Sequence, residues 1–266
     1  MNSGIGGAKA HEMISVVIPT YNEARRLPAT LKAVVAYLDA CFEAFEVIVV
    51  DDNSPDGTGS IVSGYSKRLP QVRLIVQPRR IGKGAALRRG CLEARGHYVL
   101  FMDADHATPI RELKGFLPHL TGVMEGAVVG VRTYQEGESR ARRIIGLLCQ
   151  LLAHLIVFRK AVVDSQCGFK VFSYAAAQRL FSHARVNGGM IDVELFALMH
   201  RFGIPCRYVP VSWHNQEGSR VNFFASAFRD PMDMIKIRLR GLVGIYNAPV
   251  PSHKQPWSAR STTEIA

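Results

Sequence analysis

The sequence predicts an α/β domain in which helices flank a mainly parallel, Rossmann-like sheet. Five short runs are continuous in apolar and β-branched residues, as is typical of strands that are buried on both faces. These runs are residues 14–18, 46–50, 72–76, 98–102 and 127–131. Helical patterns alternate with the runs, and polar residues follow three of them directly. Both features favour a parallel sheet with ligands at the carboxyl ends of its strands.

The helices follow from the spacing of apolar residues. Between the first two runs the apolar side chains repeat at helical intervals, at Leu27, Leu31, Val34, Val35 and Leu38. A second helix is expected over residues 85–94, before the fourth run. The second half of the chain is less regular, and its patterns predict helices near 174–182 and 190–202 and a strand near 206–211.

The chain divides into four parts by composition. We expect a flexible N-terminus over residues 1–12 and a single domain over 13–221. An amphipathic, basic helical segment with one internal proline, Pro231, covers residues 222–247. The tail at 248–266 is rich in proline and poor in apolar residues, so we expect it to be disordered.

Composition excludes several classes of protein. The 266 residues are 48% hydrophobic and 21% charged, which excludes intrinsic disorder, collagen and coiled coil. Five widely spaced cysteines form no CxxC pair, which argues against a disulfide framework or a zinc site and favours a reduced compartment. The first residues contain no apolar stretch typical of a signal peptide. The net charge of +11 calls for an anionic partner such as nucleic acid, a membrane surface or a phosphorylated small molecule.

One apolar run has basic residues at both ends. Residues 144–158 contain 15 amino acids and would extend only about 22 Å as a helix. A bilayer core of about 30 Å needs roughly 20 apolar residues, so this run is too short to span it. It suits either a buried core helix or a helix that lies in a membrane interface. The flanking cations are Arg140, Arg142, Arg143, Arg159 and Lys160.

Four carboxylates stand at the ends of neighbouring predicted strands. Asp51 and Asp52 follow the second run, and Asp103 and Asp105 follow the fourth. Several anions held close together need a cation, and hard carboxylate oxygens without His or Cys favour Mg²⁺ or Mn²⁺. For both later aspartates to reach one ion, the chain must bend at Ala104. The alternative is that these residues cap helices or line solvated turns.

Gly82-Lys83-Gly84 follows the third run and opens a predicted helix. Backbone N–H groups and a lysine at such a position can hold an anion. The segment lacks the P-loop and dinucleotide-binding patterns, which counts against an ATPase or a dehydrogenase. A tight turn with a solvated lysine is the alternative.

Four segments together resemble the nucleotide-sugar half of inverting family-two glycosyltransferases with the GT-A fold. They are VVIPTYNE (16–23), VVDDNSPDGT (49–58), GKGAALRRG (82–90) and FMDADHATP (101–109). Later segments are similar to dolichyl-phosphate β-glucosyltransferases and, less closely, to dolichyl-phosphate mannose synthases. They are DSQCGFKVF (164–172), IDVELF (191–196), VSWHNQEGSR (211–220) and IKIRLRG (235–241). The resemblance implies a GT-A catalytic domain over 13–221 with amphipathic interfacial helices.

The resemblance also implies roles for individual residues. The donor-binding set contains Pro19, Tyr21, Glu23, Asp51, Asp52, Lys83, Asp103 and Ala104. Asp103 and Asp105 would hold the metal, with Asp105 as the direct ligand, and Arg220 would lie near the leaving diphosphate. Arg132 and Arg143 match positions that bind the acceptor phosphate. His106 and the pair Gly188-Gly189 depart from the family pattern and leave the donor sugar open.

The chemistry explains why these residue types are needed. Breaking the anomeric C–O bond places negative charge on the departing diphosphate, which a metal and cations stabilise. An alcohol acceptor needs a general base, for which Asp192 or Glu194 are the candidates. A phosphate monoester needs none, because its second pKa of about 6 leaves it largely dianionic at neutral pH.

These features together predict an enzyme that transfers glucose from UDP-glucose to a polyprenyl or dolichyl phosphate. It would be attached peripherally to the cytosolic face of a membrane, with residues 144–158 and 223–245 providing the apolar contact. GDP-mannose is the alternative donor. A polysaccharide glycosyltransferase with Asp192 as its base is the alternative enzyme. A nucleic-acid-binding module is disfavoured, because acidic strand ends oppose phosphate binding without a metal, and no protein partner is predicted.

Overall fold

The computed structural model describes residues 9–133, 151–157, 164–214 and 223–247. Its centre is a seven-stranded sheet in the order β3-β2-β1-β4-β6-β5-β7. The strands are β1 (Ile14–Thr20), β2 (Phe45–Asp51), β3 (Val72–Val76), β4 (Tyr98–Met102), β5 (Ala127–Thr133), β6 (Phe169–Ser173) and β7 (Cys206–Ser212). The five continuous runs and the later strand near 206–211 are all present.

Parallel pairing dominates the sheet. β1 lies between β2 and β4, parallel to both, and β2 is also parallel to β3. β6 is antiparallel to β4 and β5, and β5 is parallel to β7. The carboxyl ends of β1, β2 and β4 therefore meet at one edge, as the sequence predicts, and the predicted α/β fold class is confirmed.

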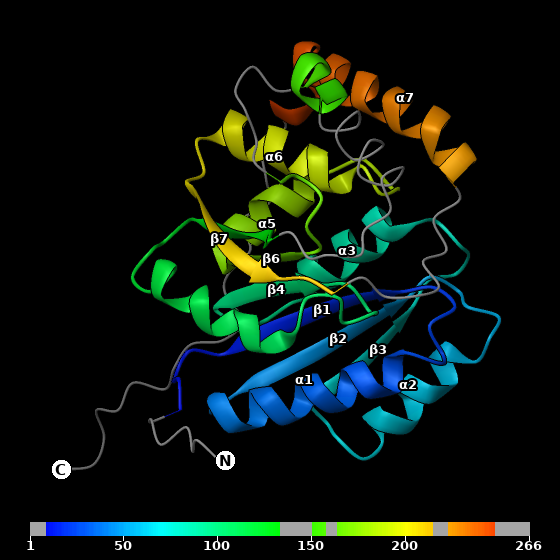
Figure 1. The fold of residues 1–266 in the computed structure, drawn as a ribbon, viewed down its shortest axis with the longest axis vertical. Helices are drawn as coiled ribbons and strands as arrows, with labels where there is room; N and C mark the ends of the chain where they lie inside the picture. The colour runs from blue at the N-terminus through cyan, green and yellow to red at the C-terminus, as the bar shows by residue number, and fades with distance from the viewer. Residues whose placement is uncertain (1–8, 134–150, 158–163, 215–222, 248–266) are drawn as a thin grey trace.

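Helices cover both faces of this sheet (Figure 1). The α-helices are α1 (Leu27–Cys41), α2 (Thr58–Ser66), α3 (Lys83–Leu92), α5 (Tyr174–His183), α6 (Ile191–Phe202) and α7 (Phe223–Leu242). Three 3₁₀ helices are η1 (Ile110–Gly115), η2 (Leu117–His119) and η3 (Ile245–Asn247). Helices α1 and α2 lie on one face, and α3, α5 and α6 lie on the other, with α7 beyond α6 (Figure 1).

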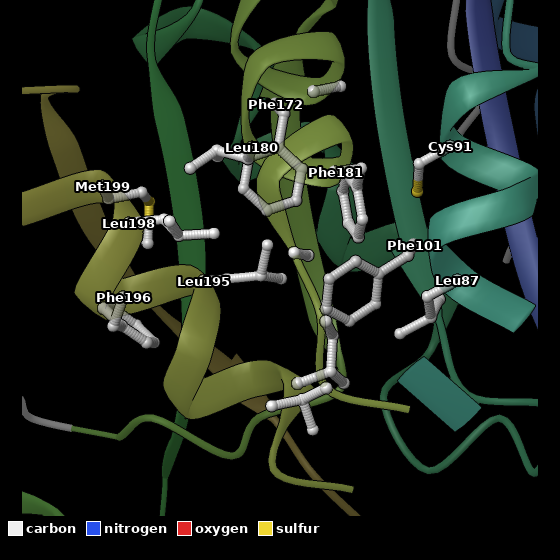
Figure 2. Packing of buried hydrophobic residues seen from close by; sticks show 14 of the residues in the cluster. Leu87, Cys91, Phe101, Phe172, Leu180, Phe181, Leu195, Phe196, Leu198 and Met199 are labelled. Atoms are coloured by element: carbon white, nitrogen blue, oxygen red, sulfur yellow. The ribbon is translucent and has the colours of Figure 1, made fainter. Parts of the chain in front are cut away.

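The two faces have separate hydrophobic cores. Under α1, the buried side chains of Leu27, Leu31, Val34 and Leu38 pack on the sheet, which is the stripe that the sequence predicts. On the other face, the core contains several phenylalanine rings among its aliphatic side chains (Figure 2). Phe101 and Phe172 stack with ring centroids 6.0 Å apart, and Phe181 meets Phe172 edge-on at 5.8 Å. Such aromatic pairs add stability beyond the area that they bury.

Four of the described elements were not predicted from the sequence: β6, α2 and the 3₁₀ helices η1 and η2, which follow β4. In β6 the strand pattern is interrupted by Lys170, whose side chain is fully buried in the structure. A buried lysine needs an acidic partner, and here the partner, Asp192, lies on α6.

Helix α7 has two different faces. Met234 and Ile237 are buried in the same core cluster as Ala153. Exposed apolar side chains repeat along the opposite face at Met232, Ile235, Leu239 and Leu242. We call these four residues the α7 stripe.

The predicted apolar run at 144–158 is described in part: residues 151–156 are helical, and Leu151 and Leu155 are exposed. Within the parts of the chain that the structure describes, no helix combines the length and apolar character needed to cross a bilayer.

Candidate active site

A tight turn at the end of β4 brings Asp103 and Asp105 into one site. The His106 N–H donates to the Asp103 carbonyl at 3.5 Å, and the Thr30 hydroxyl donates to the Ala104 carbonyl at 2.7 Å. His106 adopts a φ of +57°, a left-handed conformation that is rare for residues with a Cβ but less so for His, Asn and Asp. The bend that the sequence requires at Ala104 is therefore present.

The two carboxylates interact electrostatically. Burial, together with the nearby charge of Asp103, raises the pKa of the Asp105 carboxyl above its ordinary value. The Asp103 side chain is 41% exposed and its Oδ1 lies 2.8 Å from the Lys83 ammonium. Because the two neighbouring carboxylates repel each other, a cation bound between them would stabilise their charged forms.

Gly168, at the start of β6, makes room for the Asp103 side chain. A Cβ built at Gly168 would lie only 1.9 Å from the Asp103 Oδ2 atom. The Gly168 carbonyl also accepts a hydrogen bond from the Asp103 N–H at 3.2 Å. Any larger residue here would displace the Asp103 carboxylate. The segment DSQCGFKVF therefore contributes to the site by having glycine at position 168.

Lys83 connects the β4 turn with α6. Its ammonium lies 2.8 Å from Asp103 and 3.6 Å from Asp192. Burial alone would lower the pKa of Lys83, but the charges of Asp103 and Asp192 outweigh it and raise the pKa above its ordinary value. Asp192 also forms a short ion pair with the buried Lys170. Acidic and basic groups thus alternate from the core to the solvent-facing Asp103.

Asp51 and Asp52 have local partners instead. Asp52 accepts hydrogen bonds from the N–H groups of Ile81 and Gly82, both at 2.8 Å, and so fixes the turn that precedes Lys83. Asp51 accepts from the Ser54 hydroxyl at 2.5 Å and from the Thr20 hydroxyl at 3.1 Å. Both carboxylates are nearly fully buried. In this structure they shape the loops around the predicted donor site.

The residues after β1 also have partners that the sequence did not reveal. The Arg80 guanidinium lies 4.0 Å from the centre of the Tyr21 ring, and Arg26 binds both carboxylate oxygens of Glu23. Pro19 is a β1 residue paired with Val50 of β2. The only sequence signal for Arg80 is its position just before Gly82-Lys83-Gly84.

The predicted acceptor residue Arg132 lies at the end of β5. Its guanidinium donates to both carboxylate oxygens of Asp164, at 2.8 and 2.9 Å, and lies 5.7 Å from the centre of the Trp213 ring. Burial alone would raise the pKa of Asp164, but the hydrogen bonds and charge of Arg132 more than offset this and lower it. The other predicted cations, Arg143 and Arg220, lie outside the described residues.

The site provides two carboxylates for a metal. No cluster of three or more His, Cys, Asp or Glu side chains suited to a metal ion occurs within the described part of the chain. Mg²⁺ and Mn²⁺ nonetheless often take one or two protein carboxylates and fill their other positions with water and substrate phosphates. Asp103 and Asp105 fit this mode, because they are two interacting carboxylates on one turn and the Asp103 side chain is 41% exposed.

The sequence profile of glycosyl transferase family 2 matches residues 15–181. A dolichyl-phosphate beta-glucosyltransferase from Trichomonas vaginalis is 35% identical over 244 residues, covering 86% of this chain and 72% of that protein. The protein of the same name from Homo sapiens is 35% identical over 252 residues, covering 88% and 78%. Its counterpart from Saccharomyces cerevisiae is 30% identical over 254 residues, covering 88% and 76%.

Solved structures show the same fold at lower identity. Mannosyl-3-phosphoglycerate synthase from Rubrobacter xylanophilus aligns with a TM-score of 0.65 and 18% identity, covering 94% of this chain and 79% of that one. Glucosyl-3-phosphoglycerate synthase from Mycobacterium tuberculosis, in complex with Mn²⁺, UDP and phosphoglyceric acid, aligns with a TM-score of 0.62 and 21% identity, covering 90% and 80%. The strand-end carboxylates therefore stand in a shared fold. The chain belongs to glycosyl transferase family 2, and dolichyl-phosphate beta-glucosyltransferases are among its homologues.

Proposed function

We propose that this protein transfers glucose from UDP-glucose to a polyprenyl or dolichyl phosphate with the help of Mg²⁺ or Mn²⁺. The observation that supports it most strongly is the 30–35% identity to dolichyl-phosphate beta-glucosyltransferases over 86–88% of the chain. A structural neighbour holds Mn²⁺ and UDP-glucose, which supports the choice of donor and metal.

The donor would bind at the β4 turn. When present, a divalent cation supplies positive charge beside the departing diphosphate. Asp103 and Asp105 would hold this cation. The hydrogen bond from Thr30 to the Ala104 carbonyl stabilises the turn that brings the two carboxylates together. The Lys83 ammonium forms ion pairs with Asp103 and with Asp192. We propose that it also binds an oxygen of the donor diphosphate.

The state of the α6 carboxylates supports a phosphate acceptor. A hydroxyl acceptor would need a base, yet the Asp192 side chain is only 4% exposed and is bound by Lys170 and Lys83. Glu194 is fully buried and accepts hydrogen bonds from two backbone N–H groups and a tyrosine. Neither carboxylate is placed to take a proton from an incoming alcohol. A lipid phosphate, already anionic, needs only cations such as Arg132 and Arg143 to hold it.

The exposed apolar residues support peripheral attachment to a membrane, for which we propose the cytosolic face. The α7 stripe, together with Leu151 and Leu155, presents apolar side chains that no part of the described chain covers. The exposed Lys236 lies beside the stripe. Buried apolar area and flanking cations, each worth about 1 kcal/mol near anionic lipid, are what an interfacial helix needs.

A transfer assay tests the reaction. The purified protein is incubated with labelled UDP-glucose or GDP-mannose and a short polyprenyl phosphate, with and without a chelator. We expect lipid-linked glucose from UDP-glucose, loss of product with the chelator and recovery with excess Mg²⁺ or Mn²⁺. Product from GDP-mannose alone would replace the donor, and transfer only to a free polyprenol or a sugar hydroxyl would overturn the proposed acceptor.

Vesicle sedimentation tests the attachment. We expect Leu239→Glu to weaken binding to anionic vesicles about tenfold, because it places a charge within the apolar stripe. Met124→Glu is the matched control, since Met124 is 89% exposed and lies in the loop between η2 and β5. Equal binding by the two variants would contradict the assignment of the α7 stripe to the membrane.

A further inference from the structure

Glu194 is a fully buried carboxylate that joins two segments distant in sequence. Its Oε2 atom accepts hydrogen bonds from the N–H groups of Arg185 and Val186, at 2.9 and 2.7 Å. Its Oε1 atom accepts from the Tyr246 hydroxyl at 2.6 Å, and the Arg240 Nη1 atom lies 3.7 Å from the same oxygen. One side chain of α6 therefore holds both the segment before α6 and the C-terminal segment formed by α7 and η3.

The segment held by Glu194 packs directly against the glycines around Lys83. The Asn187 carbonyl accepts hydrogen bonds from the N–H groups of Gly84 and Ala85, at 2.8 and 3.3 Å. A Cβ at Gly82 would lie 2.4 Å from the Asn187 carbonyl oxygen, and one at Gly84 would lie 2.3 Å from that of Val186. Because the two backbones are in close contact, a shift of residues 186–187 must also move the first turn of α3.

Lys83 stands between those two glycines. The position of its ammonium, 2.8 Å from Asp103, depends on the backbone that Asn187 holds. The contacts thus run without a gap from Tyr246 through Glu194 and residues 186–187 to Lys83. Burial and the charge of Glu194 raise the pKa of the Tyr246 hydroxyl, so it remains a donor at neutral pH.

We infer that Glu194 is a positioning residue for the donor site and that its bond to Tyr246 makes the C-terminal segment part of that arrangement. The inference rests on the proposed function in one respect, since it takes the ligand of Lys83 to be the diphosphate of the donor. It adds a coupling: any contact that moves α7 and η3 alters how firmly Lys83 is held. Glu194 does not touch the reacting atoms and acts through Val186 and Asn187.

Hydrogen exchange tests the coupling without any assay of activity. In Tyr246→Phe, which removes one hydroxyl, we expect exchange at the Gly84 and Ala85 amides to accelerate about three- to tenfold, while amides of β4 are unchanged. Tyr65→Phe is the matched control, because the Tyr65 hydroxyl donates to the Pro28 carbonyl on the opposite face of the sheet. Unchanged exchange at Gly84 and Ala85, or the same acceleration in the control, would overturn the inference.

Kinetics provide a second readout that loss of stability alone would not produce. Tyr246→Phe should raise the KM for the donor by about three- to tenfold with little change in kcat or in the KM for the acceptor. Glu194→Gln should retain most of the donor affinity, because its amide oxygen can accept from the backbone and its NH₂ can donate to Tyr246. Glu194→Ala should lose it. An equal fall in kcat for all three variants, with donor KM unchanged, would contradict a positioning role.

The two proposals fail in different ways. If the wild-type protein transfers no sugar, the proposed function fails while the exchange experiment still decides the coupling. If transfer occurs but Tyr246→Phe leaves hydrogen exchange at the Gly84 amide unchanged, only the proposed coupling is wrong. Should Glu194→Ala not fold, Tyr246→Phe decides the question alone.

Discussion

The ends of β2 and β4 each present a pair of aspartates, and the two pairs differ in almost every physical respect. Asp51 and Asp52 are nearly fully buried, and each accepts at least two hydrogen bonds from neighbouring loops. Asp103 is 41% exposed, and the pKa of Asp105 is raised by burial and by Asp103. The first pair is held by hydrogen bonds within the protein, whereas the second pair, with Lys83 2.8 Å from Asp103, is the one proposed to hold a cation.

The two pairs show that the role of a residue at a strand end does not follow from its residue type alone. Partners distinguish the pairs, because the Asp52 carboxylate is held by two backbone N–H groups, whereas the charges of Asp103 and Asp105 repel each other and would be stabilised by a cation. The pair after β2 shapes the loops around the proposed donor site, and the pair after β4 is proposed to hold the metal. The following experiments separate the two roles.

The largest effect is expected from Asp105→Asn. The substitution removes a proposed metal ligand but also relieves repulsion with Asp103, so transfer should fall by about 100-fold or more while the protein stays folded. Paired measurements of kcat/KM and of thermal unfolding check this. A parallel loss of stability and activity would place Asp105 with the structural pair.

The opposite pattern is expected from Asp52→Ala. It leaves the N–H groups of Ile81 and Gly82 without their acceptor, and the free energy of unfolding should fall by about 2–3 kcal/mol. Chemical denaturation measures the change. Asp52→Asn is the matched control and should lose about half as much, because it keeps one acceptor oxygen. Full stability of Asp52→Ala would contradict the structural role.

The pH dependence sharpens the comparison further. Because the pKa of Asp105 is higher in the folded protein than in the unfolded chain, the folded state binds more protons between those two values. Without metal, the contribution of Asp105 to stability should therefore decline as pH rises through this window, and Asp105→Asn should remove that decline. Melting curves from pH 3 upward test the sign. Mn²⁺ should offset the decline in the wild type only.

The smallest effect is expected from Thr30→Val, which keeps the shape of the side chain but removes its hydrogen bond to the Ala104 carbonyl. Loss of this bond should cost about 1 kcal/mol of stability. It should also reduce transfer a few-fold by loosening the β4 turn. Denaturation and initial rates measure the two. An activity loss as large as that of Asp105→Asn would mean that Thr30 does more than support the turn.

Much of the fold could be predicted from the sequence, because strands that are buried on both faces of a parallel sheet have continuous runs of apolar residues. Strand β6 could not, because Lys170 interrupts its apolar pattern and the partner that makes this acceptable lies on α6. Helix α2 begins after the left-handed Gly57 and has few buried apolar residues, so its pattern was weak.

The candidate site was predictable to the same degree. The strand-end rule places both pairs of aspartates at one edge of the sheet, as the structure has them, and the bend predicted at Ala104 is present. The rule cannot tell which side chains already have partners within the protein. The hydrogen-bond donors to Asp52 are the N–H groups of residues 81 and 82, and the partner of Arg132 is Asp164. Such partners are set by tertiary packing and carry no local sequence signal.

The place of β6 in the sheet has a consequence for how the chain assembles. β5 pairs with β6 and β7, both of which come later in the sequence, whereas β1, β2 and β3 pair within the set β1 to β4, and β4 also pairs with β6. During synthesis the amino-terminal half can form first, but β5 emerges before its neighbours exist. Completion of the sheet is a late step that closes a long loop. A nascent chain that ends before Phe169 presents the open edge of β4, which is a template for pairing with another molecule.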